Sequence, residues 1–285
     1  MKILKKIFKI IFIVLMVLVI GLIITAHILL QPKTDKKLVK KLTTRYTDPI
    51  IHHRTYKTYE YRTIHLQKRI DTTLPILIFV HGSPGSILDF KRYLKDSMIN
   101  AKSNIISYER IGYGPKNYGK TPADLEVELG VLHDLVKEYP EEKIVLAGYS
   151  YGGPVILASD KNYKYKVSMA SAVVGEYEPM FIALSFYKWK LTRWLMPPTV
   201  RAAAKEKYAH VDEFSEYKNR WNESPAKVIN IHGDKDWIVP YKNSEFLQQI
   251  FEKDKFEMVT IPGGGHELIW SDFELIRAVI LKTLK

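Results

Sequence analysis

The sequence predicts an α/β fold in which helices cover both faces of a mostly parallel central sheet. The first observation is that short apolar runs alternate with helical segments, an order that produces parallel strands joined by helices. The second is a break in this alternation at residues 176–225, which lack a strand pattern and are rich in Trp and Tyr. We therefore predict a core formed by residues 52–175 and 226–285, with a helical cap inserted at 176–225.

The N-terminus predicts a membrane anchor ahead of this core. Residues 1–9 form a basic tail, and the 21 residues 10–30 contain no Asp, Glu, Lys or Arg. At 1.5 Å per residue this stretch spans about 30 Å, the thickness of the hydrocarbon core of a bilayer. A cleaved signal peptide is the alternative, but its apolar stretch is normally shorter, and Ile24 with Ala26 make a poor cleavage site. We therefore expect a transmembrane helix at residues 10–30.

Lysines flank both ends of this helix, so the positive-inside rule gives little preference for either orientation. The basic start followed by an apolar run resembles an export signal. We therefore expect a single-pass membrane protein with a cytoplasmic N-terminus, an extracytoplasmic globular domain, and membrane lipid as the partner of its N-terminal helix.

The composition limits which other classes of partner the protein can bind. The chain has 285 residues, 46% of them hydrophobic, which is enough for one large domain with an appendage. It has no cysteine, so disulfides and thiolate metal sites are excluded. The formal net charge of +12 suits either nucleic acid or an anionic membrane. Because Lys and Arg are spread along the chain without a nucleic-acid-binding module, we expect no nucleic-acid partner and favour anionic lipid. The composition leaves the oligomeric state open.

Elements are expected in the following order. Residues 31–51 are rich in Lys and Thr and are interpreted as a linker or amphipathic stalk. Apolar or alternating runs predict strands at 56–66, 74–80, 104–108, 144–147, 166–174, 227–231 and 256–261. Helical patterns are expected at 86–98, 121–139, 180–195, 243–252 and from 271 onward. In the second of these helices, Thr121 is expected to be the N-cap and Pro122 the first helical residue.

A Gly-x-Ser-x-Gly pentapeptide follows one of these strands. It covers residues 148–152, directly after the apolar run 144–147, and Pro154 then suits the first turn of a helix. This context is typical of a nucleophile elbow, in which a serine sits on a strained turn between strand and helix. The pattern predicts that Ser150 is exposed for chemistry at the carboxyl end of its strand.

Two later strand ends carry groups that can activate a serine. A serine hydroxyl needs a base to accept its proton, and the base needs a carboxylate to orient it. Asp234 and Asp236 follow the strand at 227–231, and His266 follows the strand at 256–261 after three glycines. These residues predict a Ser–His–acid arrangement in which either aspartate supplies the carboxylate.

Five motifs together resemble the α/β-hydrolase superfamily over residues 55–285. They are His-Gly-Ser-Pro-Gly (81–85), Glu-Arg-Ile-Gly-Tyr-Gly (109–114), Gly-Tyr-Ser-Tyr-Gly-Gly (148–153), Gly-Asp-Lys-Asp-Trp-Ile-Val-Pro (233–240) and Gly-Gly-His (264–266). The order serine, acid, histidine is also the one found in that superfamily. The resemblance implies an α/β-hydrolase fold with a helical cap, in a serine hydrolase similar to esterases and proline iminopeptidases.

The resemblance also implies roles for particular residues. In its Gly-x-x-Asp-x-x-Val-Pro pattern the second acid is usually the catalytic one, which points to Asp236 beside Ser150 and His266. The backbone N–H groups of Ser83 and Tyr151 would form the oxyanion hole. His81 and His232 are expected to be structural. No metal or cofactor is expected, because no His and carboxylate fall at a metal-ligand spacing with supporting context.

Three functions follow in order of preference. The first is hydrolysis of a carboxylic ester of a small-molecule acyl substrate, in a pocket lined by cap aromatics. The aromatics that could either line it or pack the cap onto the core are Phe181, Phe186, Tyr187, Trp189, Trp194 and Trp221. The second is a proline iminopeptidase-like aminopeptidase, in which Glu176 and Glu178 would bind the free amine. The third is a non-catalytic, membrane-tethered binding module on a hydrolase scaffold.

Overall fold

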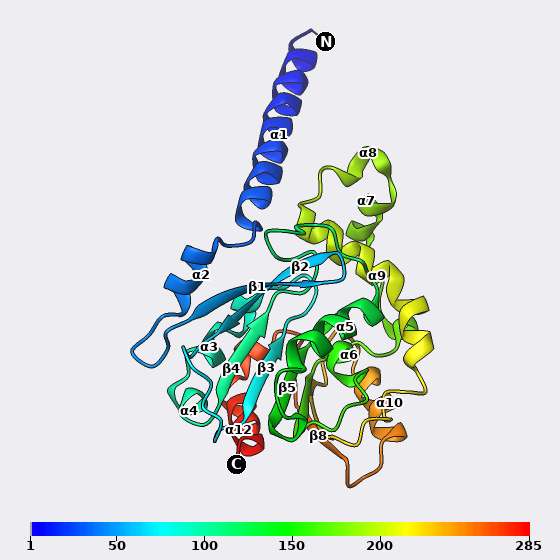
Figure 1. Cartoon of the computed structure of the whole chain (residues 1–285). Coiled ribbons are helices and arrows are strands. Elements are labelled where there is room, and N and C mark those ends of the chain that lie inside the picture. Colours follow the sequence, from blue (N-terminus) through cyan, green and yellow to red (C-terminus); the bar gives the residue numbers. More distant parts are fainter. Residues whose placement is uncertain (1) are drawn as a thin grey trace.

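The molecule is built around one eight-stranded sheet (Figure 1). The computed structural model describes residues 2–285. The strands are β1 (Ile50–Tyr56), β2 (Tyr59–His65), β3 (Ile76–Val80), β4 (Asn104–Tyr108), β5 (Ile144–Tyr149), β6 (Tyr165–Met169), β7 (Lys227–Gly233) and β8 (Phe256–Ile261). They lie in the order β1-β2-β4-β3-β5-β6-β7-β8. The hairpin β1–β2 and the pair β2–β4 are antiparallel, and all other neighbours are parallel.

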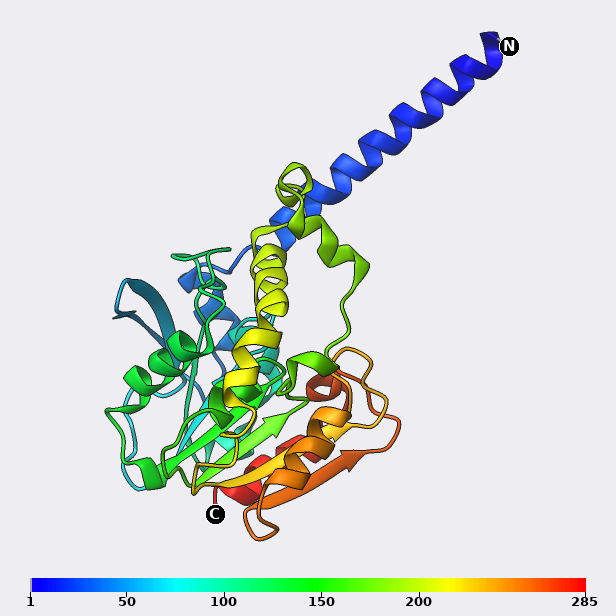
Figure 2. The same cartoon turned by 90° about the vertical axis from the view of Figure 1, so that its right-hand side faces the viewer.

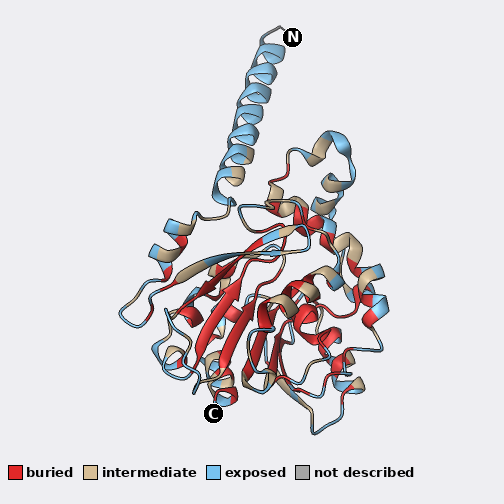
Figure 3. Cartoon of the chain, in the orientation of Figure 1, coloured by how far each residue is buried: buried red, intermediate tan, exposed pale blue. Residues whose placement is uncertain are grey.

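Helices cover both faces of this sheet, which confirms the predicted architecture. Every residue of β3, β4 and β5 is buried (Figure 3), as expected for strands with helices on both sides. One face packs against α5 (Leu125–Val136), α6 (Gly152–Leu157) and α10 (Lys242–Ile250). The other packs against α3 (Lys91–Leu94), α4 (Ser97–Asn100), α11 (Leu268–Ser271) and α12 (Phe273–Thr283). Short 3-10 turns η1 (Ile87–Phe90) and η2 (Glu141–Lys143) complete the connections.

The N-terminus is one long helix, α1 (Lys2–Leu29), which projects from the globular part (Figures 1 and 2). Within Ile3–Leu29, an 18-residue window reaches a mean hydropathy of 3.3, and none of that window is buried. The helix is long and apolar enough to cross a membrane. Its end is fixed to the domain because Tyr118 Oη and Thr199 Oγ1 donate hydrogen bonds to the Leu30 carbonyl, at 3.0 and 3.3 Å.

The stretch interpreted as a linker contains a packed helix, α2 (Asp35–Leu42). Thr34 caps it by accepting a hydrogen bond from the Lys37 amide. Leu38 and Leu42, one turn apart, are buried in the core on one face of the sheet. The lysines occupy the outer face of α2, so the helix is amphipathic and belongs structurally to the domain.

The prediction of a helix beginning at Thr121 and Pro122 was wrong. Helix α5 begins at Leu125, and Asp124 is its N-cap, accepting a hydrogen bond from the Val127 amide at 3.1 Å. Ala123 has a φ of +50°, which ends any helical path from Pro122. The Thr121 hydroxyl instead donates to the buried carboxylate of Glu206 at 2.9 Å, a tertiary contact that outweighs local capping.

The insertion between β6 and β7 consists of helical pieces. They are η3 (Gly175–Tyr177), η4 (Ile182–Leu184), α7 (Ser185–Lys188), α8 (Lys190–Arg193) and α9 (Pro198–Tyr217). The helix expected at 180–195 is therefore broken into short pieces, and the strand expected at 166–174 ends at Met169, where Ala170 takes a φ of +46°. The longest helix of the insertion, α9, was missed, although Pro198 is a typical first helical residue and three alanines follow at 202–204.

Candidate active site

Three polar side chains meet at the carboxyl edge of the sheet. Ser150 follows β5, Asp236 lies in the loop after β7, and His266 lies in the loop after β8. The Ser150 hydroxyl donates a hydrogen bond to His266 Nε2 at 3.1 Å, and His266 Nδ1 donates to Asp236 Oδ2 at 2.7 Å. Because parallel strands present their carboxyl ends at one edge, residues 116 positions apart in sequence come into contact.

Ser150 lies on a strained turn. Its φ is +53°, in the left-handed region that favours glycine. The turn requires glycine on the helix side, since a Cβ at Gly152 would come within 2.1 Å of the Val80 carbonyl oxygen. The Ser150 amide donates to the Met169 carbonyl at 2.9 Å, which fixes the turn to β6. This turn presents the hydroxyl to the edge of the sheet while the rest of the residue is buried.

The carboxylate of Asp236 is held on both of its oxygens. Oδ1 accepts hydrogen bonds from the amides of Ile238 and Val239, each at 2.9 Å. Oδ2 accepts from His266 and, at 3.2 Å, from His232. Burial by itself would raise the pKa of Asp236, but the hydrogen bonds from His232 and His266 hold it well below its ordinary value. Asp236 is therefore a carboxylate at neutral pH and can orient the His266 imidazole.

Asp234, the other candidate acid, is exposed and lies away from His266. Its Oδ1 accepts a hydrogen bond from the Gly263 amide at 2.7 Å. Gly263 has a φ of +71° in the turn that leads to His266. Asp234 thus shapes the loop that carries the imidazole.

His81 and His232 are buried and bonded to the loops beside the serine. His81 Nδ1 donates to the Gly82 carbonyl at 2.8 Å, and its Nε2 accepts from the Arg110 amide at 3.0 Å. Burial and the Arg110 charge lower the pKa of His81 to about 3, so this ring is neutral. His232 Nδ1 accepts from the Ser244 hydroxyl at 2.5 Å. His232 Nε2 also donates to the Val239 carbonyl at 3.0 Å, so each ring ties loop backbone in place beside the serine.

Ser83 and Tyr151, the two expected oxyanion donors, both line the pocket above Ser150. Within residues 2–285, the backbone N–H of neither residue donates a hydrogen bond to a protein acceptor. Two free amides beside a nucleophile are available to a negatively charged oxygen.

The pocket itself has a volume of about 250 Å³ and opens next to Ser150. Four residues, Glu176, Glu178, Phe181 and Trp189, were predicted to bind substrate. Of these, Glu178 and Phe181 line the pocket. The buried Glu178 carboxylate is ion-paired with Lys207, another lining residue. Burial raises the pKa of Glu178, although the ammonium of Lys207 counteracts this. The remaining walls are largely apolar, formed by residues such as Leu184 and Val239.

Glu176 and Trp189, which were also predicted to bind substrate, lie outside this pocket. Glu176 is exposed and faces Lys218 on the surface at 3.6 Å. Trp189 is 69% exposed and lies outside the pocket, at the outer end of the insertion. Trp221 is fully buried and stacks on Tyr217 at 5.4 Å between ring centroids, so it packs the insertion onto the core. Among the six cap aromatics, Phe181 alone lines this pocket.

The structure also reveals a buried polar network that sequence reasoning missed. Arg110 donates to the Gly82 carbonyl at 3.1 Å and to Glu206 at 2.6 Å. The Ser83 hydroxyl donates to Tyr113 Oη at 2.7 Å, and Tyr113 donates to Glu206 at 2.7 Å. Glu206 belongs to α9, so the network ties the loop that carries Ser83 to the cap. The Glu-Arg-Ile-Gly-Tyr-Gly motif contained this signal, because a charged residue next to a buried strand requires a partner.

No metal centre is evident in the part of the chain that the structure describes. Residues 2–285 contain no group of three or more His, Cys, Asp or Glu side chains arranged to hold an ion. The polar groups around Ser150 are instead used in hydrogen bonds to one another.

Relatives of known sequence match parts of this chain. A model of the alpha/beta hydrolase family matches residues 77–278. A proline iminopeptidase from Saccharolobus solfataricus is 33% identical over 91 residues, which cover 31% of this chain and 29% of that protein. The uncharacterized protein YfhR of Salmonella typhimurium is 23% identical over 201 residues, which cover 70% of this chain and 66% of YfhR. The chain thus matches less than a third of the iminopeptidase and about two thirds of YfhR.

Solved structures share the fold. An alpha/beta hydrolase fold protein from Burkholderia ambifaria has a TM-score of 0.66 at 15% identity, covering 81% of this chain and 97% of its own. A lipase-esterase related protein from Clostridium acetobutylicum has a TM-score of 0.60 at 17% identity, covering 78% and 99%. A membrane phospholipase A has a TM-score of 0.62 at 14% identity and covers 98% of both chains, an extent that includes most of α1. Because the family model matches more than half of the sequence, the protein belongs to the alpha/beta hydrolase family.

Proposed function

We propose that the protein is a membrane-anchored serine hydrolase that cleaves carboxylic esters, with Ser150 as nucleophile, His266 as base and Asp236 as acid. The observation that carries this proposal is the continuous hydrogen-bond chain from Ser150 through His266 to Asp236, at the mouth of a largely apolar pocket. The 3.1 Å distance from Ser150 Oγ to His266 Nε2 is within the range over which a proton passes between a nucleophile and its base. The 2.7 Å hydrogen bond to Asp236 would orient the His266 ring.

The reaction would proceed by acyl transfer. Ser150 Oγ attacks the ester carbonyl carbon while its proton moves to His266 Nε2. The bond to the leaving alcohol then breaks, and His266 returns the proton to the departing oxygen. A water molecule, deprotonated by His266, attacks the acyl-enzyme, and the proton returns to Ser150 as the carboxylic acid leaves. Asp236 stabilises the imidazolium that forms in each half of the cycle.

The oxyanion of each tetrahedral intermediate would bind to the amides of Ser83 and Tyr151. Their lack of a protein acceptor supports this role. Arg110 would position the first donor through its bond to the Gly82 carbonyl. Loss of one such donor typically lowers turnover on the order of 10²- to 10³-fold.

The contents of the pocket favour an ester over a peptide with a free amine. An aminopeptidase needs an acid that is free to bind the substrate's amine. Here Glu178 is already paired with Lys207, and Glu176 lies outside the pocket. The apolar walls suit an acyl chain. The structural likeness to a lipase-esterase related protein and to a membrane phospholipase A points in the same direction.

Helix α1 would keep this chemistry at a membrane surface. It is uncharged over a length that spans a bilayer, and its apolar side chains are exposed. We propose that the domain lies on the extracytoplasmic side, because the basic start followed by an apolar run resembles an export signal. Since the chain has no cysteine, a single Lys253→Cys substitution on the exposed surface gives a clean topology probe. Labelling of intact cells by a membrane-impermeant maleimide is expected, and labelling only after lysis would contradict this orientation.

The activity is tested with a fluorophosphonate probe, which reacts with activated serines. We expect the wild type to be labelled and Ser150→Ala to remain unlabelled. An unlabelled wild type would instead support a non-catalytic binding module.

The aminopeptidase remains the second candidate, since the matched relative is a proline iminopeptidase. It is tested by comparing proline arylamides with short acyl esters as substrates. Cleavage of proline arylamides that is lost in Glu178→Gln, without cleavage of esters, would overturn the ester proposal.

A further inference from the structure

The outer end of the insertion exposes an unusual set of apolar side chains. We define the tip as residues 180–195, which contain η4, α7 and α8. Ile182 and Leu191 are 87% and 86% exposed, and Trp189 and Trp194 are 69% and 66% exposed. Soluble domains rarely expose several large apolar residues within one short segment, and such a set usually marks a contact surface.

The charge of this segment identifies the kind of surface it contacts. Between residues 179 and 205 the sequence contains no Asp or Glu. The same stretch contains Lys188, Lys190, Arg193, Arg201 and Lys205. Lysines 188 and 190 are exposed and flank Trp189. Tryptophans between basic residues match the interface of an anionic bilayer, where the indole lies at the headgroups and the ammonium groups face anionic lipid.

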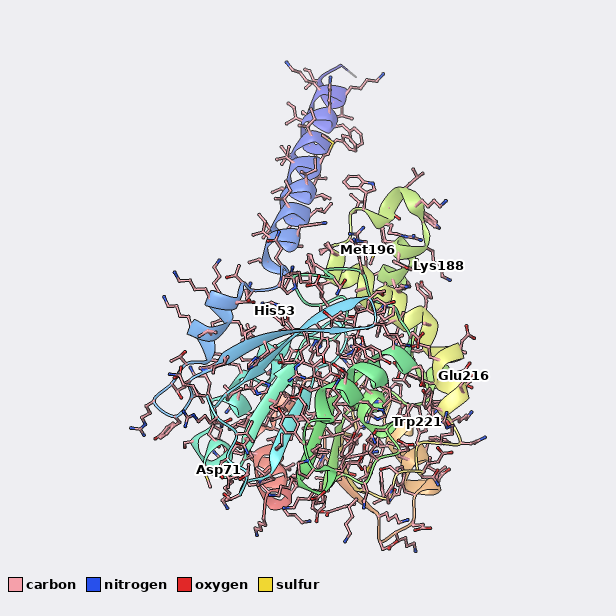
Figure 4. All side chains as sticks on the ribbon, viewed as in Figure 1. His53, Asp71, Lys188, Met196, Glu216 and Trp221 are labelled. Carbon is pink, nitrogen blue, oxygen red and sulfur yellow. The ribbon has the colours of Figure 1, made fainter. Side chains whose placement is uncertain are left out.

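The fold places the tip beside α1. Thr199, four residues after the tip, donates a hydrogen bond to the carbonyl of Leu30, where α1 ends. Figures 1 and 2 both show α7 and α8 on the side of the molecule from which α1 projects, level with its last turns. Figure 4 shows Lys188 at this outer end and Trp221 at the base of the insertion. A membrane that contains α1 would therefore meet the tip as well.

We propose that the tip docks into the headgroup region of the same anionic bilayer that α1 spans. This inference rests on the proposed membrane anchor. Lysines 36, 37, 40 and 41 on the outer face of α2 extend the positive surface on the other side of α1. The tip and α2 thus flank the point at which the helix leaves the domain.

Docking would also connect the pocket to the bilayer. Phe181 and Leu184, at the start of the tip, both line the pocket beside Ser150. The substrate class that follows is an ester with a lipid acyl chain, which would reach Ser150 from the bilayer without crossing water.

The test uses the full-length chain in vesicles that contain phosphatidylglycerol with brominated acyl chains. Bromine quenches only tryptophans at the bilayer. The chain has five tryptophans, and Trp189 and Trp194 can be replaced together by phenylalanine. Trp270→Phe is the matched control, because Trp270 is 44% exposed but lies outside the tip. We expect quenching of the wild type, its loss in the double variant, and its retention in the control.

Each outcome decides the proposal. Weaker quenching in phosphatidylcholine vesicles than in phosphatidylglycerol vesicles supports recognition of anionic lipid. Flotation with the vesicles without quenching of Trp189 and Trp194 contradicts the docking alone and leaves the anchor and the hydrolase unaffected. Failure to float contradicts the anchor and the docking together. Association of the chain with itself that is lost in the double variant would assign the surface to a second copy.

Discussion

The cluster around Ser150 and the tip of the insertion differ in how firmly their side chains are held. In the cluster, both oxygens of Asp236 accept hydrogen bonds, and the His266 ring bonds on both sides. The tip is built of short helical pieces, and several of its large apolar side chains, such as Trp189 and Leu191, are largely exposed. Under the proposed function, the edge of the sheet would supply a fixed arrangement for chemistry. The tip would supply the surface that contacts the membrane from which the substrate comes.

The largest expected effect comes from removing the nucleophile. Ser150→Ala deletes the hydroxyl that donates to His266 and leaves the surrounding packing intact. We expect ester hydrolysis to fall on the order of 10⁴- to 10⁶-fold. The measurement is steady-state turnover of both a water-soluble ester and a bilayer-borne ester. Retention of either activity would contradict a single nucleophile.

The two aspartates of one loop provide the next test. Asp236→Asn removes the carboxylate that orients His266, and turnover is expected to fall on the order of 10⁴-fold. Asp234→Asn is the matched control, since Asp234 lies in the same loop and bonds only the turn at Gly263. Its turnover is expected to stay within a few-fold of the wild type. Equal losses in both variants would show that the loop as a whole, and not the carboxylate of Asp236, governs activity.

The hydrogen-bond network between the cap and the loop that carries Ser83 is tested at Glu206. Glu206→Gln removes the charge that faces the buried Arg110, and breaking such a pair costs about 3–5 kcal/mol of unfolding free energy. Glu216→Gln on the same helix is the control, because Glu216 is exposed on the outer side of α9 (Figure 4). Its stability is expected to change by less than about 0.5 kcal/mol. Urea denaturation of both variants measures the difference.

A change at the tip is expected to lower the hydrolysis of a bilayer-borne ester but not that of a water-soluble ester. In the double variant Lys188→Glu/Lys190→Glu, two positive charges beside Trp189 are reversed, and each lysine near an anionic surface contributes about 1 kcal/mol. We expect hydrolysis of the bilayer-borne ester to fall about tenfold or more at low salt, while hydrolysis of the soluble ester is unchanged. Lys253→Glu, at an exposed position far from the tip in sequence, should leave both rates unchanged.

A pH dependence of stability is expected in the core. Burial raises the pKa of Glu128 from 4.5 to about 8, with Arg110 opposing the shift. Because the folded state holds this proton and the unfolded state releases it, the free energy of unfolding should fall as pH rises from about 4.5 to about 8. Glu128→Gln should flatten this dependence in urea denaturation at several pH values. The tip has no acid or histidine, so lipid docking should stay constant over the same range.

Much of the core and its edge could be predicted from sequence, because each motif there has a local cause. A buried apolar run before Ser150 and glycines around it specify a strand and a tight turn. The start of α5 was mispredicted because Thr121 bonds to Glu206, which is 85 residues away. Such long-range partners leave no local pattern. The same is true of the ion pair between Glu178 and Lys207, which decides what the pocket can bind.

The exposure of side chains at the tip was harder still to predict, because its aromatic residues could either line a pocket or lie on the surface. Trp189 and Phe181 are alike in sequence, yet one is largely exposed and the other lines the pocket. Only the three-dimensional position of the short helices distinguishes them. Apolar residues in an irregular segment therefore predict burial less securely than the same residues in a periodic element.

The most direct measurement is the pair of hydrolysis rates of the full-length chain in phosphatidylglycerol vesicles, on a bilayer-borne and a water-soluble ester. We expect Ser150→Ala to lose both rates together, and Lys188→Glu/Lys190→Glu to lose only the first. Loss of both rates in the tip variant, or retention of either in Ser150→Ala, would contradict the division between a catalytic sheet edge and a membrane-facing cap.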